Sequence, residues 1–278
     1  KTTLFSAWYS TTKDVSLAWY SLDEDDNDPG RFFAYIAASL QRIEPDPAPR
    51  LVALLESTSI DPHELVSALL SDLSELSSTR VVLVLDDYHH ITQPSIHQAM
   101  AFLIDHLPAN IHLVFISRAD PPLPLGRWRV SRQLTEIRAE DLRFTEAETA
   151  QFLNQTMKLS LSSEDIRTLE ARTEGWAAGL QLAALSLQKS SNPSEIITAF
   201  SGSHRYVADY LTDEVLSRLP ESLRAFLLKT SFLERFNASL CNHVLRLDDS
   251  QISLMKLERD NLFIIPLDSD SNWFRYHH

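Results

Sequence analysis

The feature that most constrains the fold is the segment Val81–Leu85 (VVLVL), an unbroken apolar run that is followed directly by Asp86 and Asp87. Such a run is typical of a strand that is buried on both faces of a parallel sheet. A second apolar segment, Ile111–Ser117, comes after a helical pattern at 94–106. Strands that alternate with helices at this spacing predict an α/β sheet.

The flanking regions extend this prediction. Residues 15–22 are rich in β-branched and aromatic side chains and are predicted to form a strand, and residues 134–139 are predicted to form another. Beyond Phe144 helical patterns dominate the chain. Near the end, residues 263–267 and 273–276 flank a turn, which predicts a β-hairpin. Helices followed by a hairpin indicate a winged-helix domain.

Several local signals predict where helices begin and where they do not. Asp28 followed by Pro29 is typical of a capped helix start, and the apolar spacing that follows predicts a helix over 29–43. The Pro-rich stretch 45–49 is predicted to be a loop. The segment Thr145–Glu148 (TEAE) resembles a capping box.

Composition excludes several classes of function. Lys and Arg total 25 against 38 for Asp and Glu, a formal net charge of −13 that disfavours stand-alone binding of nucleic acid. Cys241 is the only cysteine, so an intrachain disulfide and a Cys-rich zinc site are excluded, which fits a cytoplasmic protein. No apolar run approaches the roughly 20 residues of a membrane helix, so we expect no membrane association.

The twin acids after the apolar run form the strongest chemical signal. A buried strand that ends in two carboxylates is the Walker B pattern, and the strand carries Asp86 to the sheet edge where ligands of α/β folds bind. There Asp86 can hold Mg²⁺, and Asp87 can orient or deprotonate an attacking water. The alternative interpretation is a strand that ends in a solvated acidic turn.

Two basic positions complete the candidate site. Lys1-Thr2-Thr3 before a possible helix at 2–12 resembles the end of GxxxxGK[ST], in which the lysine meets phosphates and the hydroxyl holds Mg²⁺. Arg118 directly follows the second apolar strand and can reach a γ-phosphate from there. Taken alone, Lys1 also fits a random polar start and Arg118 a surface arginine. Their order along the chain is that of a signal-transducing P-loop ATPase.

At this point a specific resemblance emerges over the whole chain. The sequence resembles the nucleotide-binding region of the MalT-like large ATP-binding regulators of the LuxR family, a branch of the STAND ATPases. The segments that carry this resemblance are 18–29 (AWYSLDEDDNDP), 83–91 (LVLDDYHHI), 117–125 (SRADPPLPL), 142–145 (LRFT), 173–183 (TEGWAAGLQLA) and 274–278 (FRYHH).

The resemblance implies roles for matching residues. It implies ATP or ADP and Mg²⁺ as cofactors, with Lys1 and Thr2 as the end of Walker A. Gly175 and Trp176 align with a Gly-x-Pro motif that packs near adenine, although Ala177 replaces the proline. His277 resembles a winged-helix histidine that reaches the β-phosphate of ADP in a closed state.

The sequence departs from the family pattern at its start. The chain looks cut at the Walker A lysine, because the glycine-rich loop and the strand before it are absent from these residues. We therefore expect a gap in the sheet, and little or no nucleotide binding by this segment alone. We expect a weak ATPase activity only in the intact protein.

The fold is thus predicted to be an α/β P-loop NTPase core, a parallel sheet with its first strand missing, followed by a helical domain and a winged-helix domain. The predicted domains are 1–140, 141–199 and 200–278, and residues 189–193 read as a boundary. The paired histidines 89–90 and 277–278 lack the spacing of a metal site, so we expect no metal there.

The predicted function is an ATP/ADP-binding switch module of a transcriptional activator. Nucleotide exchange and slow hydrolysis would control self-association, an inducer would act through a C-terminal sensor, and a separate helix-turn-helix domain would bind DNA. The alternative is a non-catalytic scaffold with a degenerate ATPase fold that binds a protein or an inducer. A third hypothesis, direct DNA binding through residues 200–278, is disfavoured because that segment carries about as many acids as bases.

Overall fold

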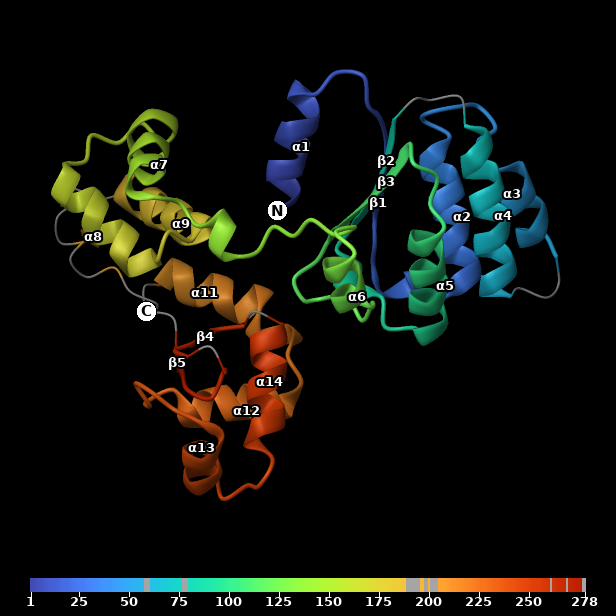
Figure 1. Ribbon diagram of the computed structural model, residues 1–278. Helices are drawn as coiled ribbons and strands as arrows, with labels where there is room; N and C mark the ends of the chain where they lie inside the picture. The colour runs from blue at the N-terminus through green and yellow to red at the C-terminus, as the bar shows by residue number, and fades with distance from the viewer. Residues whose placement is uncertain are drawn as a thin grey trace. The chain divides into compact units, whose positions relative to one another are not determined.

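The structure is a computed structural model that describes residues 1–57, 61–76, 80–188, 196–197, 200, 205–260, 262–268 and 270–276. The chain divides into two compact units, Lys1–Thr135 and Glu136–His278, which run from blue to green and from green to red in Figure 1. The predicted boundaries at 189–193 and near 199 fall on or beside residues outside this description, so the three-domain division stays a prediction.

The first unit is built on a three-stranded parallel sheet in the order β1-β2-β3. The strands are β1 (Ser16–Ser21), β2 (Val81–Asp86) and β3 (Ile111–Ile116). Every residue of β2 is buried, because β2 lies between the other two strands and both faces of the sheet are covered. The α/β core predicted from the apolar run is confirmed.

Helices cover both faces of this sheet (Figure 1). The described helices of this unit are α1 (Thr2–Thr11), α2 (Pro29–Leu40), α3 (Pro49–Leu55), α4 (Pro62–Glu75), α5 (Pro94–Asp105) and α6 (Leu125–Val130), with the short 3-10 helices η1 (Glu24–Asn27) and η2 (Tyr88–His90). The predicted cap of α2 is confirmed, since the Asp28 side chain accepts from the backbone N–H of Arg31. Proline at the first helical position fits each of α2 to α5, because that N–H has no partner within a helix.

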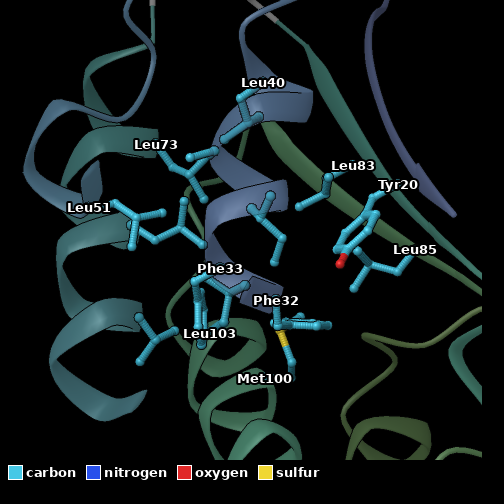
Figure 2. Packing of buried hydrophobic residues seen from close by; sticks show 14 of the residues in the cluster. Tyr20, Phe32, Phe33, Leu40, Leu51, Leu73, Leu83, Leu85, Met100 and Leu103 are labelled. Carbon is cyan, nitrogen blue, oxygen red and sulfur yellow. The ribbon is translucent and has the colours of Figure 1, made fainter. Parts of the chain in front are cut away.

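The two faces of β2 pack into separate cores. Leu83 and Leu85 meet α2, whose Phe32 and Phe33 are fully buried (Figure 2). On the other face, Val82 and Val84 pack with Phe5 of α1 and Trp19 of β1. Burial of each large apolar side chain stabilises the fold by about 1.5–3 kcal/mol, so alternate residues of one strand hold helices on opposite faces.

Two predictions for this unit were wrong. Residues 134–139 form no strand, because this segment pairs with no other strand and an extended chain without a hydrogen-bonded neighbour is not a sheet element. The Pro-rich loop is also shorter than predicted, since Pro49 begins α3. The buried Asp72 of α4 accepts the backbone N–H of Leu51 at 3.0 Å and so satisfies a donor at the start of α3.

The second unit is mostly helical and ends in a hairpin. Its elements are η3 (Glu140–Leu142), α7 (Glu146–Ala150), a π-helical segment η4 (Gln151–Thr156), α8 (Ser163–Thr173), α9 (Ala177–Gln188), α11 (Arg205–Glu214), η5 (Leu216–Arg218), α12 (Glu221–Thr230), α13 (Ala238–Leu245), α14 (Ser250–Arg259), β4 (Ile264–Pro266) and β5 (Phe274–Tyr276). The predicted capping box is present, because the Thr145 side chain accepts from Glu148 and the Glu148 side chain accepts from Thr145.

Among the residues that the structure describes, this unit has two hydrophobic cores. One gathers residues of α8, α9 and α11, with Leu169, Leu180 and Ala183 fully buried. The other joins α12 to α14 with the antiparallel hairpin, where Phe236 and Phe274 are both buried. The predicted hairpin and the helices before it are therefore confirmed. In the part of the chain that the structure describes, no helix is long and apolar enough to cross a membrane.

Candidate functional site

The start of α1 meets the carboxyl ends of β2 and β3. Thr2 Oγ1 donates to Asp86 Oδ1 at 3.1 Å, although the two residues lie 84 positions apart. Lys1 Nζ donates to the carbonyl oxygen of Ser117 at 2.5 Å, across 116 positions. Ser117 directly follows β3, so parallel strands deliver both contacts to one edge of the sheet. The structure thus brings Lys1, Thr2 and Asp86 together.

Asp86 is a buried carboxylate with defined partners. It is only 3% exposed and accepts the Thr2 hydroxyl and the backbone N–H of Asp87, the latter at 3.0 Å. Burial raises the pKa of Asp86 above its usual value; the Thr2 hydrogen bond opposes this rise and the charge of Asp87 adds to it. A cation bound at this edge would offset the cost of burying the charged Asp86 carboxylate. It would also reduce the repulsion between Asp86 and Asp87.

The side chains at this edge fit a Mg²⁺ site that is completed by water and phosphate. They do not suit a metal site made of protein ligands alone. Among the described residues, no three His, Cys, Asp or Glu side chains gather in a way that could hold a metal ion. Mg²⁺ is commonly held by one or two carboxylates, with waters and phosphate oxygens completing its shell. The Asp86 carboxylate and the Thr2 hydroxyl are ligands of this kind, so they would hold the ion only together with a phosphate.

Asp87 turns the chain at the edge of the sheet. Its φ of 56° lies in the left-handed region, and η2 begins at the next residue. The Asp87 side chain is 48% exposed, and its Oδ1 lies 3.8 Å from His89 Nδ1. Asp87 is therefore the more exposed of the two acids.

His89 is a residue of this edge that the sequence argument missed. Burial lowers the pKa of His89 to about 4, and the neighbouring His90 adds to this shift. The charge of Asp87 opposes the shift, whereas the charges of Arg118 and Lys1 increase it. His89 is therefore neutral at pH 7, and its buried Nδ1 has no hydrogen-bond partner. The sequence showed this residue only as half of a histidine pair, because burial beside Asp87 is a tertiary property.

Arg118 follows Ser117 in the turn after β3, and the Ser117 hydroxyl donates to the carbonyl oxygen of Ala119 at 2.6 Å within that turn. Because Arg118 directly follows Ser117, its backbone lies at the same end of β3 as the carbonyl that Lys1 contacts. Two basic residues, Lys1 and Arg118, and two carboxylates, those of Asp86 and Asp87, thus lie at one end of the sheet. This combination suits a group that carries both phosphate charge and a divalent cation.

Gly175 and Trp176 lie in the second unit, between α8 and α9. Gly175 has a φ of +68°, and a Cβ placed there would lie 2.4 Å from the carbonyl oxygen of Phe144. The backbone N–H of Phe144 donates to the carbonyl oxygen of Gly175 at 2.8 Å. Only glycine permits these two backbone segments to lie so close together. Trp176 packs against Tyr210 with ring centroids 5.7 Å apart.

The structure accounts for Gly175 through backbone packing. The contact of Gly175 and Trp176 with adenine stays a prediction. His277 lies outside the described residues, so its contact with a β-phosphate also stays a prediction.

The fold is that of a Walker-type ATPase core followed by a winged-helix domain. A Walker-type ATPase of Pyrococcus abyssi matches 99% of this chain and 85% of its own with a TM-score of 0.63; at 12% identity this likeness shows the fold alone. The family model of the MalT winged helix domain matches residues 212–278.

Two curated relatives make the assignment more particular. The chain is 38% identical over 284 residues to the HTH-type transcriptional regulator MalT of Serratia proteamaculans and 36% identical over 282 residues to that of Yersinia enterocolitica. Each match covers 100% of this chain and 31% of the relative, so the chain spans about a third of their length. The resemblance to the MalT-like regulators is confirmed along the whole chain.

Proposed function

We propose that these residues form the ATP/ADP-binding switch module of a MalT-like transcriptional activator. The observation that carries the proposal is the hydrogen bond from Thr2 at the start of α1 to the buried Asp86 at the end of β2. It supports one site for a cation and a phosphate, with Lys1 beside it. The first N–H groups of α1 have no partner within the helix and add to the attraction for an anion.

Each residue of the edge has a definite task in this proposal. Bound Mg²⁺ and ATP supply the electrophilic phosphorus and the charge that neutralises the leaving group. Thr2 and Asp86 hold the cation, and Lys1 exchanges the carbonyl of Ser117 for phosphate oxygens. Asp87 orients the attacking water and takes its proton, and His89 lies within 3.8 Å of that carboxylate. Arg118 pairs with the γ-phosphate.

A switch requires contacts that differ between its two states. Arg118 and the cation supply such a difference, because ADP lacks the γ-phosphate that both would contact. In the proposed cycle, ADP favours a closed form in which His277 meets the β-phosphate. ATP and an inducer favour a self-associating form that binds DNA through a separate helix-turn-helix domain, and slow hydrolysis in the cytoplasm resets the protein.

The assignment is tested in the intact protein that contains these residues. Lys1→Ala should abolish ATP binding in a calorimetric titration, because it removes the phosphate-binding ammonium. Asp86→Ala should lower the ATP hydrolysis rate by about 10²-fold or more, since it removes the carboxylate that holds the cation. Lys13→Ala removes an exposed lysine just after α1 and serves as the matched control.

Wild-type affinity and turnover in both variants would refute this assignment. The nucleotide content of the purified intact protein separates the switch from the scaffold. ADP or ATP near one per chain supports the switch, whereas protein free of nucleotide that also fails to bind ATP supports the scaffold.

A further inference from the structure

Asn27 joins two loops at the edge of the sheet. Its Oδ1 accepts from the backbone N–H of Thr92 at 2.7 Å, from the N–H of Gln93 at 3.0 Å and from the Thr92 hydroxyl at 3.2 Å. Its Nδ2 donates to the carbonyl oxygens of His90 at 2.9 Å and Glu24 at 3.0 Å. One carboxamide thus ties η1 to a segment more than 60 positions later in the chain.

The helix η1, which carries Asn27, is itself stabilised by side-chain hydrogen bonds. Asp23 and Asp26 form a capping box at η1, and the Asp26 side chain is 2% exposed. Arg31 of α2 donates to Asp26 at 2.8 Å. The acidic run that precedes α2 therefore stabilises η1 through its own hydrogen bonds and its contact with Arg31.

The segment that Asn27 holds also carries Asp87, which orients the attacking water in the proposed site, and His89. Asp87 and His89 lie between β2 and the carbonyl that Asn27 holds at His90. The backbone of Asp87 is left-handed, a conformation that costs a non-glycine residue about 1 kcal/mol or more and persists only where its surroundings impose it. On the inner side, the fully buried Tyr88 hydrogen-bonds His97 through its hydroxyl at 3.0 Å.

We propose that Asn27 is a positioning residue for nucleotide hydrolysis: it sets the position of Asp87 and His89 by holding the backbone from His90 to Gln93. This inference rests on the proposed function. Asn27 acts through the loop and not on the nucleotide, so its loss should slow the chemical step and spare binding. A displacement of about 1 Å at a reacting group can cost on the order of 10²-fold in rate.

The test measures the ATP dissociation constant, the single-turnover hydrolysis rate and the thermal midpoint of the intact protein. Asn27→Ala should lower the rate by about tenfold or more while the dissociation constant stays within about twofold of wild type. Asn27→Asp keeps the three accepted bonds and loses the two donated ones, so it should fold and show a smaller loss of rate.

Asn154 offers a matched control far along the sequence. Its side chain clamps a loop in the same way, because it donates to the carbonyl oxygen of Leu161 at 3.2 Å and accepts the N–H of that residue at 2.9 Å. Asn154→Ala should leave the hydrolysis rate within about twofold of wild type.

The outcomes distinguish the two proposals. If the wild type hydrolyses ATP and both Asn27 variants keep its rate, the positioning role is refuted and the switch stands. A parallel loss of ATP binding, hydrolysis and thermal midpoint in Asn27→Asp would make Asn27 a purely structural residue and would also refute the role. A wild-type protein that neither binds nor hydrolyses ATP would overturn the proposed function itself.

Discussion

At the scale of single residues, positions with unusual environments carry most of the information. His89 combines a buried nitrogen without a partner with a pKa lowered to about 4, chiefly by burial. Asp86 combines burial with a raised pKa, again chiefly through burial. Perturbed groups of this kind concentrate at functional sites, and here both lie at one end of β2.

Gly175 supports a clean prediction at this scale. Gly175→Ala should destabilise the second unit by about 2 kcal/mol or more, because the new Cβ meets the Phe144 carbonyl and the backbone has a positive φ. Gly126→Ala is the matched control, since nothing lies within 4 Å of the position that its new Cβ would take and alanine favours the helix. Urea unfolding of both variants measures the difference, and an unchanged midpoint for Gly175→Ala would contradict the packing argument.

At the scale of elements, side chains join helices that the local sequence does not pair. Asp72 of α4 is fully buried and accepts the N–H of Leu51 and the guanidinium of Arg50, the latter at 3.0 Å. It therefore fixes α3 on α4. Glu75 also contacts Arg50, at 2.6 Å, but its side chain is 66% exposed.

These two acids should respond differently to substitution. Asp72→Ala should destabilise the first unit by about 2 kcal/mol, because it leaves the buried backbone N–H of Leu51 without a partner. Glu75→Ala should cost at most about 1 kcal/mol, since an exposed ion pair contributes little. Thermal or urea unfolding compares the two, and equal losses would show that burial does not govern this pair of contacts.

At the scale of the whole molecule, the structure shows how the hairpin is tied within the second unit. Arg275 of β5 donates to Glu174 at 2.7 Å, 101 positions earlier in the chain, and Arg143 lies 3.4 Å from the same carboxylate. The Glu174 side chain is only 9% exposed, so the pair is well shielded from water. It connects the winged-helix hairpin to the turn that contains Gly175.

Loss of this contact should loosen the hairpin. Arg275→Ala should increase hydrogen exchange at residues 264–266 and 274–276, because the hairpin loses its ion pair to the end of α8. Arg224→Ala removes an exposed ion pair with Glu221 inside α12 and should leave that exchange unchanged. Exchange measured by mass spectrometry would contradict the prediction if the two variants behaved alike.

The sequence by itself determined the elements whose signals are local. The VVLVL run predicted β2, and the caps at Asp28 and Thr145 predicted helix starts, because a cap or an apolar period depends on residues only a few positions apart. The pattern of acids and basic residues also predicted that Lys1, Thr2 and Asp86 lie at one edge of the sheet, where the structure places them. The resemblance to MalT-like regulators followed from the same short segments.

Only the tertiary structure decided which distant groups meet. The bonds from Asn27 to His90 and from Leu51 to Asp72 cross 63 and 21 positions, and no local pattern specifies such partners. Residues 134–139 have strand-like composition but pair with no neighbouring strand, so composition there predicted the wrong element. Burial and pairing depend on where the chain returns, which the physical chemistry of one short segment does not contain.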